Sequence, residues 1–457
     1  MTALPTAPRS SWVREQARPL LELALPAVLA ASVARAGDVI SLALTGHYDS
    51  AALAGVAGAI VVVELALGVL LAGVTGYQVS CAHHLGGGDR AAAVRALHAA
   101  LRPVGVAAVV VACALILTAR PLVSLTLHDP VAVTAGVAYL RARALSLPLA
   151  VLSALNTITL QSAKRTRLTL LTNCVTVPVN LLASWLLTYG IGPFPRLGAA
   201  GNGLGITLAL LCANVLQLVL LRRAGLWDWL GTLRTTRWDP VEARGSWQLA
   251  WPAMVSMTVD YLASFAFFAA IGLLSVTDLA ASRVVFQLVL LIFMLSNSFS
   301  AAAGVLMSRA AGGEEAAGVP RSAAIRDPWR ANRILVAGAL TLAGCVLAVT
   351  ARPVLWLFTG DPAVVSAAVG GTLLVAVSLP LVALTVSNTA ALRALRDTRS
   401  DMVANTVASW AVQLPLAWLA VRAGWGLTGA FTGVAGYWLV RAALTERAAR
   451  RALAAAA

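Results

Sequence analysis

The sequence predicts an all-α integral membrane protein whose twelve transmembrane helices form two homologous six-helix lobes. Three observations predict this fold class: an apolar composition, apolar runs long enough to cross a bilayer, and an internal repeat. Hydrophobic residues make up 59% of the 457 residues and charged residues 12%, with a mean hydropathy of +0.83. A soluble protein of this length could not bury so much apolar surface, and a helix needs about 20 apolar residues to span a bilayer.

The apolar runs give the expected spans in chain order. They lie at about 20–45, 53–76, 94–118, 132–155, 168–190, 198–221, 246–272, 279–306, 333–350, 364–389, 403–421 and 427–444. A polar connector separates the first six spans from the last six. The expected organisation is therefore a tail (1–19), an N-lobe (20–222), a connector (223–245), a C-lobe (246–446) and a second tail (447–457).

The distribution of arginine predicts the orientation of the chain. Alternate loops are rich in basic residues, such as 163–167, whereas the loops between them carry about one arginine each, such as Arg120 and Arg196. Basic loops stay in the cytoplasm, so we expect a multi-pass inner (plasma) membrane protein with both termini cytoplasmic. The same distribution explains the formal net charge of +15 without a nucleic-acid partner.

The internal repeat relates the two halves of the chain. The segment 146–173 aligns without a gap with 378–405, and LALPA (23–27) resembles LAWPA (249–253). Six spans per half bring both halves in from the same side, which predicts an axis along the membrane normal and a substrate site near the mid-membrane. The alignment makes equivalent pairs of Asn156 with Asn388 and of Asn173 with Asn405.

Three of the expected spans contain an acid near the middle, namely Asp38, Glu64 and Asp260. A charged residue at the bilayer centre costs about 2.5–3.5 kcal/mol on insertion scales, so these acids are functional candidates. Asp38 shares a helix face with Arg35, so a structural ion pair is the alternative to a protonatable carboxylate. Glu64 is either a functional acid or the partner of Arg35, and the sequence leaves both open.

Polar neighbours are expected around two of these acids. Asn173 and Asn180 lie seven residues apart, so they share a face that orients Asp38, lines the N-lobe cavity or packs against another helix. Asp260 is expected to bind a substrate cation or coupling ion near Gln287 and Asn297, with helix packing as the alternative.

Several other classes of protein are not indicated. The five cysteines form no metal-binding spacing, so neither a metal site nor a disulfide framework is expected. The chain contains no D-D-x-x-D motif of a prenyl transferase and no G-x-x-x-x-G-K-[ST] loop of an ATP-driven pump. An enzyme is therefore not expected.

The order of these features resembles the multidrug and toxic compound extrusion (MATE) transporters. Each half opens with L-A-x-P, the first half continues to Asp38 and Gly46-His47, and GVTGYQVSCAHHLGGGD (73–89) and LGAAGNG (197–203) follow. The resemblance implies a V-shaped pair of six-helix lobes that exports organic, often cationic, compounds in exchange for H⁺ or Na⁺.

The resemblance also implies roles for two acids. In the damage-inducible F-type branch, which this chain resembles most, an acid in the first helix couples protons, and Asp38 occupies that position. In the NorM-type branch an acid eight residues after the helix-seven proline couples cations, and Asp260 stands eight residues after Pro252. The helix-ten acid of that branch is missing from 379–392, and Ser184 replaces an acid of some relatives.

The expected function is therefore H⁺-coupled antiport of a small organic compound by alternating access. Asp38 is the expected proton-coupling residue, and the expected substrate or cation site comprises Asp260, Asn180, Asn173, Glu64 and Arg35. The proton motive force replaces any cofactor, and a monomer in the lipid bilayer suffices. The alternatives are a Na⁺-coupled exporter and a lipid-linked glycan flippase of the same superfamily, which would need several arginines where Arg35 stands nearly alone.

Overall fold

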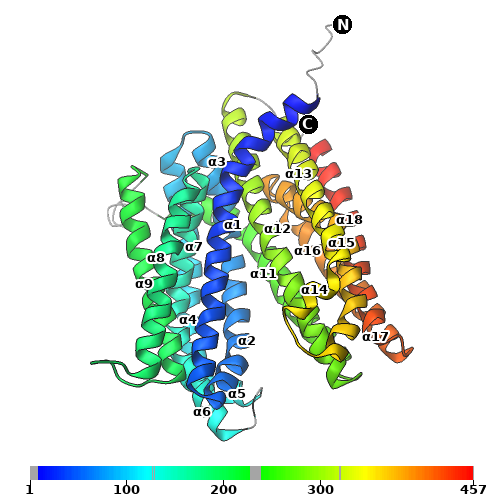
Figure 1. Ribbon diagram of the computed structural model, residues 1–457. Helices are drawn as coiled ribbons and strands as arrows, with labels where there is room; N and C mark the ends of the chain where they lie inside the picture. Colours follow the sequence, from blue (N-terminus) through cyan, green and yellow to red (C-terminus); the bar gives the residue numbers. More distant parts are fainter. Residues whose placement is uncertain (1–8, 126, 128, 227–237, 319–320, 456–457) are drawn as a thin grey trace. The chain divides into compact units, whose positions relative to one another are not determined.

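The structure is a computed structural model that describes residues 9–125, 127, 129–226, 238–318 and 321–455 (Figure 1). These residues form helices joined by short turns, and no strand occurs among them. The first half comprises α1 (Arg9–Tyr48), α2 (Ser50–Ala72), α3 (Thr75–Gly86), α4 (Arg90–Leu117), α5 (Ala119–Ser124), α6 (Pro130–Ala144), α7 (Ser146–Ser162), α8 (Thr166–Tyr189) and α9 (Ala199–Arg223).

The second half repeats this plan with longer and more broken elements. It comprises α11 (Pro240–Ile271), α12 (Val276–Ala316), α13 (Arg321–Val349), α14 (Ala351–Trp356), α15 (Pro362–Ala394), α16 (Thr398–Thr406), the π-helix η1 (Val407–Gln413), α17 (Leu414–Arg422) and α18 (Gly426–Ala455).

The described helices account for the twelve expected spans. Nine helical stretches are long and apolar enough to cross a membrane, and α6 with α7, bent by 41°, makes a tenth. The other two expected spans correspond to α16–η1–α17, which is one span divided into three short helices, and to α18. The prediction of an all-helical, twelve-span membrane protein is therefore confirmed.

Aspartate-proline pairs at repeat-equivalent positions begin α6 and α15. Asp129 accepts a hydrogen bond from the N–H of Ala132 over 3.1 Å, and Asp361 accepts one from the N–H of Ala363 over 2.8 Å. The carboxylate satisfies an N–H that has no partner within the helix, and the proline that follows needs no N–H partner at the first position. The same local chemistry therefore starts equivalent helices in both halves.

The helices group into two compact units, each described here by itself. The N-unit comprises residues 25–254, and the C-unit comprises residues 1–24 and 255–457. Helices α1 and α11 are each divided between the units. In the C-unit the first part of α1 packs in a cluster with α12, α13 and α15, through Leu20, Leu23 and Ala24.

The helices extend beyond the apolar runs from which they were predicted. α1 begins at Arg9 and α18 ends at Ala455, so much of both expected tails is helical. α11 begins at Pro240, inside the expected connector, and residues 227–237 of that connector lie outside the described residues. A helix satisfies its own backbone hydrogen bonds, so it can continue past the apolar segment.

Candidate functional site

The part of α1 that carries Asp38 is held firmly within the N-unit. Asn173 on α8 donates a hydrogen bond to the Ala30 carbonyl over 2.9 Å, and Asn202 on α9 donates one to the Ser41 carbonyl over 2.9 Å. A Cβ at Gly37 would lie 2.6 Å from Val177 Cγ1, so only a glycine permits this close approach of α1 to α8. α1 is therefore fixed before, at and after the position of Asp38.

Asp38 belongs to a group of four charged residues that we call the N-unit charge cluster: Arg35, Asp38, Glu64 and Arg143. Arg35 Nη1 lies 3.7 Å from Asp38 Oδ2, and the Asp38 side chain is 60% exposed. Arg143 on α6 interacts electrostatically with Asp38, and Glu64 on α2 interacts with the other three. Two carboxylates and two guanidinium groups cancel formally, so the cluster can gain or lose a proton without a large imbalance of charge.

The cluster brings together three of the residues proposed from the sequence and one that was missed. Arg35 lies near both Asp38 and Glu64, so it is shared between the two acids rather than committed to one. Arg143 was not singled out, although it lies inside the expected span 132–155, where a basic residue is itself a signal of function. The expectation that Arg35 is nearly the only arginine within the spans is therefore wrong, because Arg143 interacts with the same two acids.

The two asparagines of α8 make contacts that favour helix packing. Asn173 bonds the backbone of α1, as described above. Asn180 is buried and accepts a hydrogen bond from Ser184 Oγ over 3.2 Å, one turn further along α8. The contact of Asn173 joins α8 to α1, so Asn173 acts on the site through the position of α1. The contact of Asn180 lies within α8.

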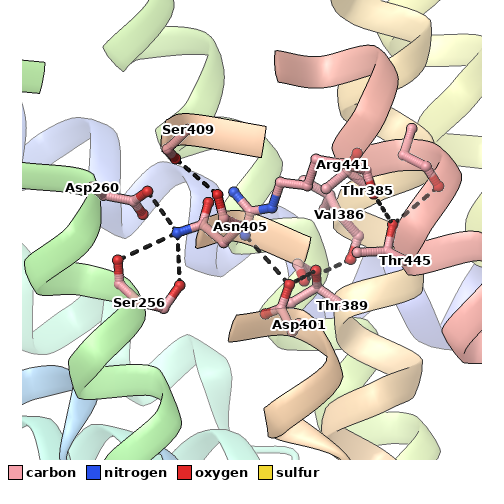
Figure 2. A network of polar contacts seen from close by, with 12 residues as sticks. Ser256, Asp260, Thr385, Val386, Thr389, Asp401, Asn405, Ser409, Arg441 and Thr445 are labelled. Carbon is pink, nitrogen blue, oxygen red and sulfur yellow. Dashed lines mark hydrogen bonds and ion pairs between the residues drawn. The ribbon is translucent and has the colours of Figure 1, made fainter. Parts of the chain in front are cut away.

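Asp260 has its own polar environment inside the C-unit (Figure 2). Asn405 on α16 donates from Nδ2 to Asp260 Oδ1 over 2.7 Å and to Ser256 Oγ over 2.8 Å. The side-chain oxygen Oδ1 of Asn405 accepts a hydrogen bond from the Tyr437 hydroxyl over 2.8 Å. Asn405 is fully buried, so its hydrogen-bonding groups have exchanged water for these partners.

A buried ion pair lies next to Asn405 in the same network (Figure 2). Arg441 Nη2 lies 3.4 Å from Asp401 Oδ1, and both side chains are 10% exposed. Thr389 donates a hydrogen bond to Asp401 over 3.0 Å, and Arg441 also donates to the Tyr437 hydroxyl. The C-unit therefore has a continuous network from Asp260 on α11 to Asp401 on α16.

The sequence predicted Asp260 but not its neighbours. Gln287 and Asn297, the expected neighbours on α12, both have exposed side chains, and the contact to Asp260 comes from Asn405. A signal for Asn405 was present, because it is the repeat equivalent of Asn173. Arg441 lies inside the expected span 427–444, so like Arg143 it could have been found by searching the spans for basic residues as well as acids.

The repeat explains part of this geometry. Asn173 contacts the carbonyl of Ala30, four residues after Pro26, and Asn405 contacts that of Ser256, four residues after Pro252, over 3.3 Å. Asparagine thus binds the backbone of the equivalent helix in both units. The C-unit has an acid, Asp260, one helical turn after the bonded Ser256 carbonyl, whereas the N-unit has Ala34 at the equivalent position.

A second repeated pair also braces equivalent helices. Asn156 on α7 donates to Asn214 Oδ1 on α9 over 3.3 Å, and Asn388 on α15 donates to Glu446 Oε2 on α18 over 3.0 Å. Asn156 and Asn388, which the sequence alignment makes equivalent, therefore brace equivalent helices in the two units.

This fold, with membrane-spanning helices in duplicate and charged groups inside them, defines a membrane transport protein. The family model described as MatE matches residues 26–186 and 252–419, one match in each half of the chain. The chain therefore belongs to the MatE family, whose members are transporters and not enzymes.

Relatives and solved structures agree with this assignment. The probable multidrug resistance protein NorM of Deinococcus radiodurans is 31% identical, over 99% of this chain and 100% of that protein. A protein of the same description from Geobacillus kaustophilus is 28% identical, over 94% of this chain and 91% of that protein.

Two solved structures show the same fold at lower identity. The Vibrio cholerae MATE transporter VcmN in the bent form has a TM-score of 0.86 at 17% identity, with 97% of this chain and 98% of that chain covered. A MOP superfamily transporter from Pyrococcus furiosus, for which a reverse polarity of the binding pocket suggests a different function, has a TM-score of 0.86 at 15% identity, with 99% of each chain covered.

Proposed function

We propose that this protein exports organic compounds from the cell in exchange for protons, by alternating access, and that Asp38 is the proton-coupling residue. The observation that carries the proposal is the exposed carboxylate of Asp38, on a firmly held part of α1, within the N-unit charge cluster. Exposing a charge to lipid is costly, so this carboxylate is expected to face water or substrate.

The charge balance of the cluster supplies a mechanism for exchange. With both acids ionised the four charges cancel, and a proton on Asp38 leaves the cluster with a net charge of +1. A positive site repels a cationic substrate, and a bound cation opposes the proton in the same way, because each charge interacts with the other over a short distance. This competition couples export of the substrate to uptake of the proton when the substrate and the proton favour different conformations of the protein.

The same charges favour protons over Na⁺ as the coupling ion. Arg35 and Arg143 lie beside the two carboxylates, and a guanidinium group repels a metal cation that would need the same oxygen atoms. The proton motive force is then the energy source and no cofactor is needed. We place the chain closest to the damage-inducible F-type branch, as a monomer in the plasma membrane.

A second candidate substrate class is favoured by one observation. Arg35 and Arg143 give the cluster two guanidinium groups, which suit a substrate that carries an anionic group, as a lipid-linked glycan does. The test below therefore includes anionic and zwitterionic compounds as well as cations.

The proposal is tested in everted membrane vesicles with an imposed pH gradient, acid inside. A substrate should cause proton release in wild type, and Asp38→Asn should reduce that release to the level of vesicles without the protein, with or without Na⁺. Asp49→Asn is the matched control, because Asp49 caps α2 in the same unit and asparagine caps a helix equally well.

The results separate the alternatives. Transport in Asp38→Asn at the wild-type rate would contradict the assignment of Asp38, and a requirement for Na⁺ would contradict proton coupling. A response only to compounds with an anionic group would contradict a cationic substrate and support the second candidate.

A further inference from the structure

A chain of hydrogen bonds joins the guanidinium group of Arg441 to the carboxylate of Asp260 inside the C-unit. Figure 2 shows its last link, from Asn405 to Asp260. Arg441 on α18 donates from Nη1 to the Tyr437 hydroxyl. Tyr437 donates to Asn405 Oδ1 over 2.8 Å, and Asn405 donates from Nδ2 to Asp260 Oδ1 over 2.7 Å. A cation and an anion on two different helices are thus connected by two neutral side chains.

The chemistry of each group gives this chain a single direction. A guanidinium group has only donors, so the Tyr437 oxygen must accept, and its one hydrogen is left for Asn405. The Asn405 amide then turns its carbonyl oxygen to Tyr437 and its NH₂ group to Asp260. The opposite orientation of the amide would place its oxygen against the carboxylate, where both atoms are acceptors.

We propose that Arg441 is a positioning residue that acts on Asp260 through Tyr437 and Asn405, and that the chain keeps Asp260 ionised and bound to α16. The proposal rests on the proposed function, because it adds a part for Asp260 in the same export, in which Asp260 exchanges this contact for a proton or a substrate cation. Hydrogen bonds to a charged group are stronger than neutral ones, so loss of the carboxylate charge weakens the link to Asn405.

The charged groups at and around this chain come from four helices, α11, α15, α16 and α18. Asp401 on α16 pairs with Arg441 and accepts from Thr389, which holds the guanidinium group in place. Arg393 on α15 interacts electrostatically with Asp401 and Arg441. Asp260 itself interacts with Arg441 and Asp401. Arg441 is therefore the cation that compensates Asp260 directly, and Arg393 acts one step further away.

The N-unit shows that the asparagine contact does not need these charges. Asn173, the repeat equivalent of Asn405, binds the Ala30 carbonyl without an adjacent acid, because Ala34 stands eight residues after Pro26, where Asp260 stands eight residues after Pro252. Burying charged groups costs free energy that a packing contact alone would not require. The charges of the C-unit therefore need a role beyond joining α11 to α16.

The test reads the protonation of Asp260 directly in the purified full-length protein, by infrared spectroscopy over a range of pH. The carboxyl band of Asp260 is the one that Asp260→Asn removes. We expect Asp260 to be ionised at neutral pH in wild type. Tyr437→Phe, which breaks the chain but keeps the Arg441–Asp401 pair, should increase the protonated fraction about tenfold.

Two further variants and a control complete the design. Arg441→Gln should act in the same direction as Tyr437→Phe, and Arg441→Lys, which keeps the positive charge, should lie closer to wild type. Tyr77→Phe is the matched control, because Tyr77 is a fully buried tyrosine of the N-unit whose hydroxyl lies 2.6 Å from Thr159 Oγ1. It should leave the Asp260 band unchanged.

Three results would overturn the proposal: an Asp260 that is already protonated at neutral pH in wild type, a band that is the same in Tyr437→Phe as in wild type, and an equal shift in Tyr77→Phe. The spectra need no substrate and no transport. Failure of the proposed function would instead appear as proton-coupled transport that survives Asp38→Asn, so the two failures are distinguishable.

Discussion

The N-unit charge cluster makes an opposed pair of predictions at the scale of single residues. Glu64→Gln removes one negative charge and leaves the cluster with a net charge of +1 when Asp38 is ionised, whereas Arg143→Gln leaves it at −1. Positive charge disfavours proton uptake by Asp38 and negative charge favours it. We therefore expect the pH profile of export to move by about one pH unit to the acidic side in Glu64→Gln and to the alkaline side in Arg143→Gln.

The measurement is substrate-driven proton release in vesicles over a series of pH values. The double variant, which restores the formal charge balance, serves as the control and should have a profile near that of wild type. Movement of both single variants in the same direction would show that the cluster acts by packing and not by charge.

Single residues also show what the sequence could and could not predict about the site. Asp38, Glu64 and Asp260 were identifiable because an acid is expensive inside an apolar run. Their partners Arg143, Asn405 and Arg441 lie far away in the chain, and hydrophobic spacing does not say which faces of distant helices meet. For the same reason the sequence proposed Gln287 and Asn297 as neighbours of Asp260 and did not reveal its contact with Asn405.

At the scale of helices, the broken span α16–η1–α17 is the element that sequence spacing did not reveal. Its apolar run reads as one helix over 403–421, but a π-helical stretch begins at Val407, directly after the segment that carries Asn405. Ser409 Oγ, in the π-helix, donates a hydrogen bond to the backbone carbonyl of Asn405 over 2.9 Å. π-helical turns occur frequently at functional sites, and this one lies beside Asn405, which donates a hydrogen bond to Asp260.

Two helical glycines, one in the contact between α8 and α9 and one on α13 without a close neighbour, give predictions of opposite sign. A Cβ at Gly205 would lie 2.2 Å from Ser184 Oγ and 2.6 Å from its backbone N, so Gly205→Ala should force α8 and α9 apart. Overpacking of this kind costs about 1–3 kcal/mol. Gly338 on α13 has no such neighbour within 4 Å, so Gly338→Ala should stabilise its helix by about 0.5–1 kcal/mol.

The melting temperatures of the two variants in one detergent, compared with that of wild type, test this pair. Each variant is the control for the other, because both add a single methyl group to a helical glycine. A Gly205→Ala protein as stable as wild type would contradict the close contact of α8 and α9.

At the scale of the whole molecule, the repeat was readable from the sequence and so were its consequences for equivalent contacts. The Asp-Pro helix starts, the braces at Asn156 and Asn388, and the asparagine contacts at Asn173 and Asn405 all occur in both halves. The charges do not follow the repeat: α1 carries an acid at Asp38, twelve residues after Pro26, whereas α11 carries one at Asp260, eight residues after Pro252. The two halves thus share their helix contacts but differ in the positions of their charged groups.

The distribution of arginine makes a prediction for the orientation of the whole chain. With both termini in the cytoplasm, the loops that contain Phe194 and Leu357 face outward, and the loop that contains Ala317 faces inward. All three side chains are exposed, so each position accepts a cysteine with little effect on packing. We expect a membrane-impermeant maleimide to label Phe194→Cys and Leu357→Cys in intact cells, in a background in which the five natural cysteines are replaced.

Ala317→Cys should react in everted vesicles but not in intact cells, which makes it the control for membrane integrity. The two outward positions come from different halves of the chain, so they also test whether both halves enter from the same side. Labelling of Phe194→Cys without Leu357→Cys in intact cells would mean that the halves are inverted with respect to each other, because an odd number of spans would then separate these two loops. Six spans per half would be excluded, and the parallel relation of the repeats with it.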